Sequence, residues 1–258
     1  MSDAFDPQPA ADLLYGAYRE GQQLSELPES VRPRTMPEGY AIQDRLLAAI
    51  GDGFAGWKLA IGSHKGKRTS GVGRSIGGRV LASQLYQDGA AIRMPHAGAV
   101  TVEFEIAYRI ARDIDPDAPA VATADVIGET CVAFELVLSR FFDRRAVGWP
   151  SFAADNSAFQ ALVIGPAIDP GDLAEVARTL SVEVDGVERV RAVTGEDETD
   201  PLAALADLIA VSRERGVTIP AGSLVSTGTL SVPFDLTGPG TITARFAGRS
   251  LGFALLPV

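Results

Sequence analysis

Apolar and polar side chains alternate over residues 102–110, and this period predicts a half-buried β-strand. Because successive side chains of a strand point to opposite faces, the apolar residues of this stretch share one face that can enter a core. Glu103 and Glu105 share the other face, about 6 to 7 Å apart along the chain. Two such carboxylates repel each other, and one of them binds a proton unless a cation lies between them. The pattern leaves two alternatives open: a strand edge with two solvated acids, or a site for a divalent ion with oxygen ligands.

The apolar pattern of the remaining chain predicts helices at the start and mostly strands afterwards. Helices are expected over residues 9–24, 35–50, 122–129, 170–177 and 201–215. Strands are expected over residues 54–62, 80–85, 91–94, 131–139, 159–164, 180–184, 187–193, 223–230, 241–246 and 249–257. Turn signals such as Asp185-Gly186 and the scarcity of crossover helices favour an α+β fold. We expect a mixed, mainly antiparallel β body with outer helices over residues 53–258, preceded by an N-terminal helical arm over residues 1–52.

Composition narrows the classes of function. The net charge of −10 argues against nucleic acid and anionic membranes as partners. An acidic start without a leader-like pattern, the absence of an apolar run of spanning length, and a single cysteine favour a cytoplasmic protein. The apolar setting of that residue, Cys131, predicts a buried and inert thiol. With only two histidines in the chain, a metal site would use mostly oxygen ligands, which favours magnesium, manganese or calcium over zinc.

Two ionisable residues stand inside apolar runs. Lys58 lies in the predicted strand 54–62, where it is either a buried lysine tuned for proton transfer or a strand-edge lysine that reaches water. Glu135 is the single acid of the predicted strand 131–139, and a buried acid needs a partner. We therefore predict Glu135 as a third ligand beside Glu103 and Glu105, in an open magnesium site.

Residues 62–79 reverse the sign of the charge locally. His64 lies there among five basic residues and five glycines, which are Lys65, Lys67, Arg68, Arg74, Arg79, Gly66, Gly71, Gly73, Gly77 and Gly78. One interpretation is a mobile basic loop that serves an anionic small substrate as lid and funnel. The other is a solvated surface loop without such a role.

Several of these residues occur in an order that resembles the 2-keto-4-pentenoate hydratase and 4-oxalocrotonate decarboxylase group of the fumarylacetoacetate hydrolase-like superfamily. The order is Lys58, Glu103-Phe104-Glu105, Glu135, Ala154-Asp155-Asn156 and Ser226-Thr227-Gly228-Thr229, and the similarity covers nearly the whole chain. The resemblance implies Mg2+ or Mn2+ on Glu103, Glu105 and Glu135, with the metal chelating the 1-carboxylate and 2-oxo oxygen of a 2-keto acid. It also implies that Lys58 is the active-site lysine and that Ser226 and Thr229 line the substrate pocket. Asp155 matches a family segment, where a structural turn residue is the alternative to a substrate contact.

One departure from the group concerns the hydration step. Its hydratases usually carry an acid in a Pro-Asp-aromatic-Gly segment, whereas the matching stretch here is Ser75-Ile76-Gly77-Gly78. His64 could supply a proton-transfer group instead, or be a loop histidine without a role. The first hypothesis is a hydro-lyase that hydrates a 2-hydroxy-2,4-dienoate in aromatic catabolism, and the second is the related 2-keto acid decarboxylase. A third is a non-catalytic member that binds a small acid or partners an active homologue; the resemblance also implies a homo-oligomer.

Overall fold

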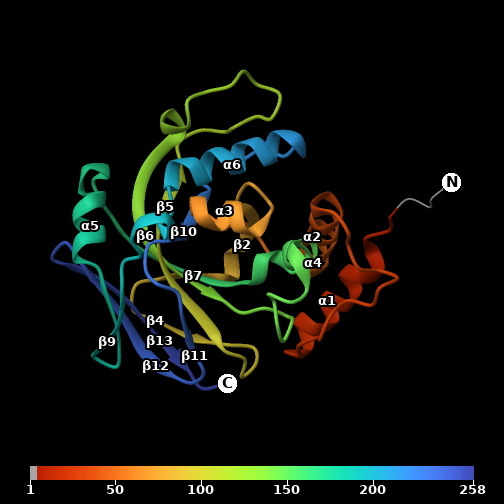
Figure 1. Cartoon of the computed structure of the whole chain (residues 1–258), viewed down its shortest axis with the longest axis horizontal. Helices are drawn as coiled ribbons and strands as arrows, with labels where there is room; N and C mark the ends of the chain where they lie inside the picture. The colour runs from red at the N-terminus through yellow and green to blue at the C-terminus, as the bar shows by residue number, and fades with distance from the viewer. Residues whose placement is uncertain (1–4) are drawn as a thin grey trace.

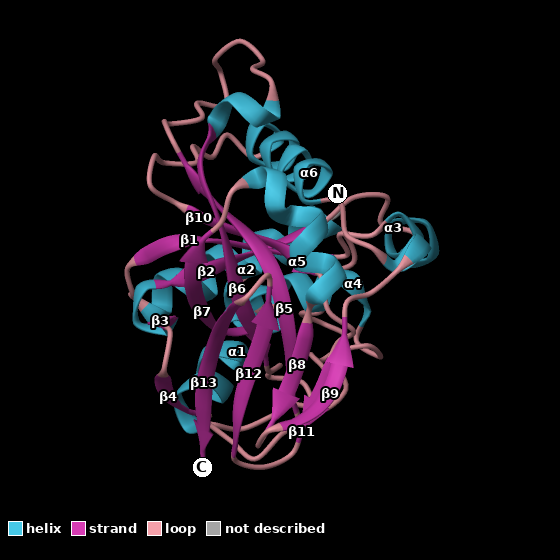
Figure 2. Ribbon diagram, turned by 90° about the vertical axis from the view of Figure 1, so that its left-hand side faces the viewer, coloured by secondary structure: helices cyan, strands magenta, loops and turns pink. Residues whose placement is uncertain are grey.

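The computed structural model describes residues 5–258, in which two β-sheets face each other and helices lie around them (Figures 1 and 2). The larger sheet has eight strands in the order β2-β1-β10-β5-β6-β7-β3, with β11 paired to β5. The smaller sheet has five strands in the order β4-β13-β12-β8-β9. Its members pair antiparallel except at β4–β13, and the larger sheet has parallel pairs at β1–β10 and β3–β7. The α+β fold with a mixed, mainly antiparallel body is therefore confirmed.

The elements have the following bounds. The strands are β1 Phe54–Ala60, β2 Ile76–Leu81, β3 Leu85–Gln87, β4 Ala90–Arg93, β5 Val100–Ile110, β6 Ile127–Val137, β7 Phe159–Ala167, β8 Ser181–Val184, β9 Val187–Arg191, β10 Leu224–Thr229, β11 Phe234–Leu236, β12 Gly240–Phe246 and β13 Arg249–Leu256. The α-helices are α1 Gln8–Glu20, α2 Met36–Ile50, α3 His64–Ser70, α4 Gly148–Ala154, α5 Leu173–Thr179 and α6 Pro201–Glu214.

The two sheets share an aromatic core. Phe104 of β5 and Phe134 of β6 contact each other edge-on, and each also contacts a phenylalanine of the smaller sheet, Phe246 and Phe253 respectively. All four rings are buried, and such pairs stabilise by about 0.5 to 1.5 kcal/mol beyond the area they bury. The apolar face of β5 is therefore fixed against the second sheet, which turns the glutamates of β5 to the opposite face.

Helices α1 and α2 lie on one side of the larger sheet, next to α4 (Figure 1). A capping box between Thr35 and Glu38 begins α2, and Gly51 ends it in the left-handed conformation. Leu14 of α1 and Leu46 of α2 share a buried cluster with Phe141, which belongs to the segment after β6. The division into an arm of residues 1–52 and a body remains a prediction, and residues 1–4 of that arm lie outside the described residues. Across residues 5–258, no helix combines the length and apolarity that crossing a bilayer requires.

Two local predictions were wrong. Residues 62–79 are not a single loop, because they contain helix α3 and the start of strand β2. Ser63 caps this helix by accepting a hydrogen bond from the Gly66 amide. The five basic residues of this stretch form ion pairs with acids from distant segments, at Asp197, Asp207, Glu196, Glu214 and Asp44, so they do not form a free basic funnel. The helix expected over residues 122–129 is a single 3-10 turn over Thr123–Val126, since from Ile127 the backbone hydrogen-bonds to β5 as part of β6.

Candidate active site

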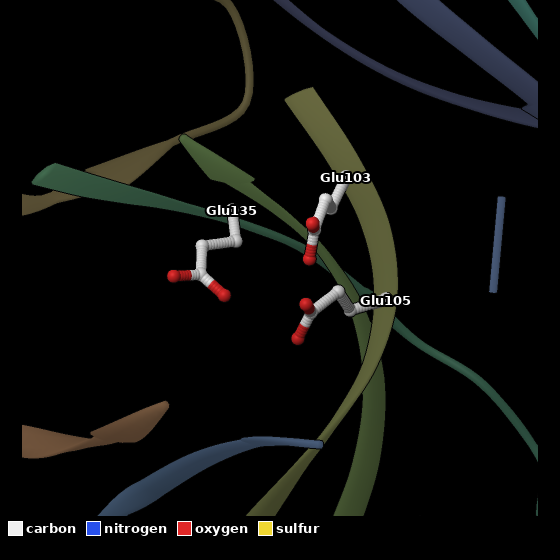
Figure 3. A group of neighbouring side chains, drawn as sticks. All are labelled: Glu103, Glu105 and Glu135. Carbon is white, nitrogen blue, oxygen red and sulfur yellow. The ribbon is translucent and has the colours of Figure 1, made fainter. Parts of the chain in front are cut away.

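Three glutamate side chains converge on the face of the larger sheet that points away from the second sheet (Figure 3). Glu103 and Glu105 project from β5, and Glu135 lies directly opposite Glu103 on the antiparallel neighbour β6. Opposed residues of such a pair have Cβ atoms about 5 Å apart and point to the same face. One carboxylate oxygen from each residue lies within 4.8 Å of the others. The convergence that the sequence predicted for residues 103, 105 and 135 is therefore present.

Strand β10 fixes the carboxylate of Glu105. The register between β10 and β5 shifts between Ser226 and Thr229, as in a β-bulge. The Ser226 hydroxyl and the Gly228 amide, the latter at 3.0 Å, both donate to Glu105 Oε2. Gly228 has φ +104°, a conformation that other residues rarely adopt, so this glycine lets the amide turn toward the carboxylate. Thr227 holds the opposite side of the bulge by donating to the Ile106 carbonyl at 2.7 Å.

The electrostatics of the cluster favour a cation. Burial raises the pKa of Glu105 well above its usual range, and the nearby charges of Glu135 and Glu103 raise it further. Burial also raises the pKa of Glu135, against the opposing effect of Lys58. Among the described residues, Glu105 Oε1 and Glu135 Oε2 are buried without a hydrogen-bond partner. Free oxygen ligands in a ring of acids are what a hard divalent ion such as Mg2+ or Mn2+ binds, so these residues fit the cation.

Lys58 provides the positive charge beside the cluster. It is 2 % exposed, and its Nζ lies 2.8 Å from Glu135 Oε1, which makes the two side chains an ion pair. Behind it, Gly78 of β2 leaves room, because a Cβ there would lie 3.1 Å from Lys58 Cγ and 2.5 Å from the Asn156 carbonyl. The Phe152 ring lies in front, with its centre 5.8 Å from Nζ. The lysine is therefore a buried residue with a carboxylate partner and not a strand-edge lysine that reaches water, while its role in proton transfer remains a prediction.

A cavity of about 180 Å³ opens beside this cluster. Of the predicted site residues, Lys58, Glu103 and Thr229 line it, while Glu105, Glu135 and Ser226 are fully buried next to them. The Thr229 hydroxyl donates to the Ser231 carbonyl at 2.6 Å, so its oxygen remains available as an acceptor. The buried ionic cluster thus forms one wall of a chamber large enough for a small organic acid.

Two predicted residues lie elsewhere. Asp155 is buried, but it receives hydrogen bonds from the Ser139 hydroxyl at 2.7 Å and from the Arg140 amide at 3.0 Å, and it forms an ion pair with the Arg140 guanidinium. This geometry is that of the structural alternative, in which Asp155 fixes the chain at the end of α4. His64 is an exposed residue at the start of α3 and does not line the cavity.

The sequence analysis missed the residues that close the cavity from loops. Arg144 lies between β6 and α4, and Asp197 and Thr199 lie between β9 and α6. An isolated bridge between Ser63 and Thr199 brings this second loop to the cavity. No local pattern marks these residues, because their position depends on contacts between segments more than 40 residues apart.

Comparison with known proteins identifies the family. Residues 80–246 match the family described as fumarylacetoacetate (FAA) hydrolase, C-terminal. The chain belongs to this family. The matched range contains Glu103, Glu105 and Glu135 together with the Ser226–Thr229 segment, and it begins after Lys58.

Curated relatives support the narrower resemblance. The chain is 28% identical to the 2-hydroxyhexa-2,4-dienoate hydratase of Comamonas testosteroni, over 95% of this chain and 99% of the relative. It is also 28% identical to a 2-keto-4-pentenoate hydratase of Paraburkholderia phymatum, over 96% of each chain. Among solved structures, the 4-oxalocrotonate decarboxylase of Pseudomonas putida G7, complexed with magnesium and adipate, has a TM-score of 0.82 over 97% of each chain at 20% identity. The resemblance to the hydratase and decarboxylase group is confirmed.

Proposed function

We propose that this protein is a Mg2+- or Mn2+-dependent hydratase that adds water to a 2-hydroxy-2,4-dienoate or 2-keto-4-enoate. The observation that carries the proposal is the convergence of three glutamates, with Lys58 buried beside them, at the wall of one small cavity. The names of the two hydratase relatives support the same reaction. A 2-keto acid presents a carboxylate and a neighbouring carbonyl oxygen, and both are suited to a site that combines a divalent ion with cationic side chains.

Each residue has a role in this proposal. Glu103, Glu105 and Glu135 hold the cation, and Ser226 keeps Glu105 in place. The bound cation would supply stabilisation of the negative charge that develops on the 2-oxo oxygen.

Lys58 moves the proton that interconverts the 2-hydroxydienoate and the 2-keto form. Its ion pair with Glu135 sets the direction of Nζ at the cavity wall. Water then adds across the distal double bond, and the product is a 4-hydroxy-2-keto acid.

Turnover of 2-hydroxypenta-2,4-dienoate, followed by the loss of its ultraviolet absorbance, tests the proposal. The full chain should consume the dienoate with Mg2+ or Mn2+ and stop after chelation. Glu135→Gln should abolish both metal binding and turnover, because the site loses a charged ligand. Glu129→Gln is the matched control on the same strand, since Glu129 is paired with Arg109 outside the cavity. A full chain that binds the metal and the dienoate without consuming it would contradict hydration.

Decarboxylation of a 2-keto diacid is the second candidate. The sequence feature that favours it is the stretch Ser75-Ile76-Gly77-Gly78, which contains no carboxylate at the place where the resemblance leads us to expect the acid of the hydratases. Release of CO2 from a 2-keto diacid, without hydration of the dienoate, would select this candidate. Metal binding without either reaction would instead support a non-catalytic member that binds a small acid.

A further inference from the structure

Asp197 is a carboxylate of the cavity to which the proposed hydration gives no role so far. Among the described residues that line this cavity, Glu103 and Asp197 are the two that carry a carboxylate, and Glu103 belongs to the cluster that would hold the cation. The stretch Ser75-Ile76-Gly77-Gly78 contains no acid, and His64 does not line the cavity. Within residues 5–258, this leaves Asp197 as the carboxylate of the cavity wall that is available for a second proton transfer.

Close packing against two glycines fixes the loop that carries this carboxylate. Asp197 ends a 3-10 turn over Gly195–Asp197, and Thr199 follows two residues later. Thr199 lies so close to Gly62 that a Cβ there would come within 2.6 Å of Thr199 Cγ2. A Cβ on Gly228 would come within 3.3 Å of the Thr199 hydroxyl oxygen. The loop is therefore held against the β10 bulge that supports the glutamate cluster.

The glutamate cluster and Asp197 differ in their access to water. Glu105 and Glu135 are fully buried, whereas the side chain of Asp197 is 55 % exposed. A 2-keto acid whose C1 and C2 oxygens lie at the cluster therefore extends its distal carbons toward the solvent-accessible end of the cavity. Solvent water reaches the Asp197 carboxylate at that end, and hydration needs a water molecule beside the distal carbons.

One oxygen of Asp197 is held by the protein, and the other is open. Lys65 Nζ of α3 donates a hydrogen bond to Asp197 Oδ2 at 2.8 Å and forms an ion pair with it. In the described part of the chain, no group donates a hydrogen bond to Asp197 Oδ1. A carboxylate oxygen without a donor from the protein can accept a hydrogen bond from water, which is the arrangement that a general base requires.

We propose that Asp197 is the general base that activates water for the hydration step. This inference rests on the proposed function, in which the cation and Lys58 act on the 2-oxo end of the substrate. It assigns the second proton transfer to a residue from the loop between β9 and α6, in place of an acid in the stretch 75–78.

The hydration step adds one water molecule and leaves Asp197 unchanged. Lys58 first transfers the hydroxyl proton of the dienoate to C5, which gives a 2-oxo acid with a C3=C4 double bond. The water oxygen bonds to C4, Asp197 Oδ1 receives a proton of the water, and the electron pair of the C3=C4 bond moves to the 2-oxo oxygen. C3 takes up a proton from solvent as the carbonyl re-forms, and Asp197 releases its proton to solvent. The new hydroxyl and hydrogen thus lie on C4 and C5, which formed the distal double bond of the dienoate.

Two reactions of the full chain with Mg2+ separate the role of Asp197 from that of the glutamate cluster. Hydration of 2-hydroxypenta-2,4-dienoate requires both. Exchange of the C3 protons of 2-oxopentanoate in D2O, followed by NMR, requires only enolisation at the 2-oxo group. Asp197→Asn should lower kcat for hydration by about 100- to 10,000-fold, the usual contribution of a general base, and retain the exchange. Asp197→Glu should recover part of the hydration rate, because the carboxylate returns.

Two control variants distinguish water activation from a structural role of the loop. Glu196→Gln changes the adjacent acid of the same turn, which pairs with Arg68 and does not line the cavity, so hydration should keep its wild-type rate. Lys65→Met removes the ion-pair partner of Asp197 but leaves the carboxylate. Because both partners of this pair are half exposed, Lys65→Met should lower kcat for hydration by less than about tenfold.

The outcomes distinguish this inference from the proposed function. Hydration at the wild-type rate in Asp197→Asn would overturn the role of Asp197. Equal losses of hydration and exchange in Asp197→Asn, or a loss in Lys65→Met as large as that in Asp197→Asn, would also overturn it, because the carboxylate would then only hold the loop. The proposed hydratase function stands in each of these cases. A wild-type chain that exchanges the C3 protons but does not hydrate the dienoate would instead overturn the proposed function, and this inference with it.

Discussion

Replacement of Lys58 by methionine separates the role of this residue in the chemistry from its role in the fold. Methionine keeps an unbranched side chain of similar length but removes the charge, so Glu135 loses the one cationic partner that it has among residues 5–258. Both partners are almost fully buried, with 2 % and 1 % of their side chains exposed. Removal of one partner of such a pair costs about 3 to 5 kcal/mol, because the other charge stays buried without compensation.

The cost should depend on pH and on the metal. Lys58 lowers the pKa of Glu135, which burial raises, so the variant moves that pKa further up. At pH 8 the Glu135 carboxylate either stays charged in a buried place or takes up a proton that the solution pH disfavours. We therefore expect the free energy of unfolding to fall by about 3 kcal/mol. For a domain of this size, this corresponds to a melting temperature lower by about 6 to 12 °C. Mg2+ at a hundredfold excess over its Kd should raise the free energy of unfolding of the variant by about 2.7 kcal/mol, because the ion neutralises the same acids.

Thermal unfolding with and without Mg2+, together with calorimetric titration of the metal, measures these effects. The Lys58→Met variant should bind Mg2+ at least as tightly as the wild type, because a neighbouring positive charge has been removed, and should lose turnover. Lys67→Met is a control, because Lys67 forms a partly buried ion pair with Asp207 at 2.6 Å. This pair should contribute about 1 kcal/mol or less to the free energy of unfolding. The melting temperature of the control variant should respond to pH and to Mg2+ as that of the wild type does. An unchanged melting temperature, or a loss of Mg2+ affinity that matches the loss of turnover, would refute the role assigned to Lys58.

Three further predictions test the surroundings of the cluster. Ser226→Ala should lower Mg2+ affinity about tenfold, because Glu105 loses the hydroxyl that orients it; calorimetry that finds the wild-type affinity would exclude this role. Gly78→Ala should destabilise the protein by about 1 to 3 kcal/mol, because the added Cβ would lie 2.5 Å from the Asn156 carbonyl. Gly77→Ala is the control and should be tolerated, because its added Cβ would meet its nearest atoms at 3.9 Å. Equal losses of stability in chemical denaturation would contradict the close packing at Gly78. The raised pKa of Glu105 means that the metal-free fold keeps a proton which the unfolded chain releases near pH 4.5, so its stability falls as the pH rises above that value. Mg2+ should therefore raise the melting temperature more at pH 8 than at pH 5, and equal increases would show that Glu105 does not bind the cation.

The features that the sequence predicts correctly are the ones with local periodicity. The alternation over residues 102–110 places Glu103 and Glu105 on one face whatever the strand pairs with, and the structure agrees. The single acid in the apolar run 131–139 similarly marks Glu135 as a buried charge that needs a partner. The sequence does not show that Glu135 lies opposite Glu103. This position follows from the register between β5 and β6, which depends on the connection between the two strands.

The errors concern residues whose partners are distant in the sequence. The basic residues of 62–79 have the composition of a flexible loop, but four of their five acidic partners, among them Asp197 and Glu214, follow more than 120 residues later. The support of Glu105 by Ser226 spans 121 residues, and the position of Arg144 depends on Thr101, 43 residues before it. A resemblance in residue order can suggest Ser226, but Arg144 emerges only when the cavity is assembled.

Anomalous diffraction at the manganese absorption edge, from crystals of the full chain grown with Mn2+ and oxalate, tests the central claim most directly. We predict one strong peak that lies about 2 Å from a carboxylate oxygen of each of Glu103, Glu105 and Glu135, with oxalate in the adjacent cavity. The claim would be contradicted by a manganese peak that lies beside other residues. It would also be contradicted if no peak appeared between the three carboxylates at a saturating concentration of Mn2+.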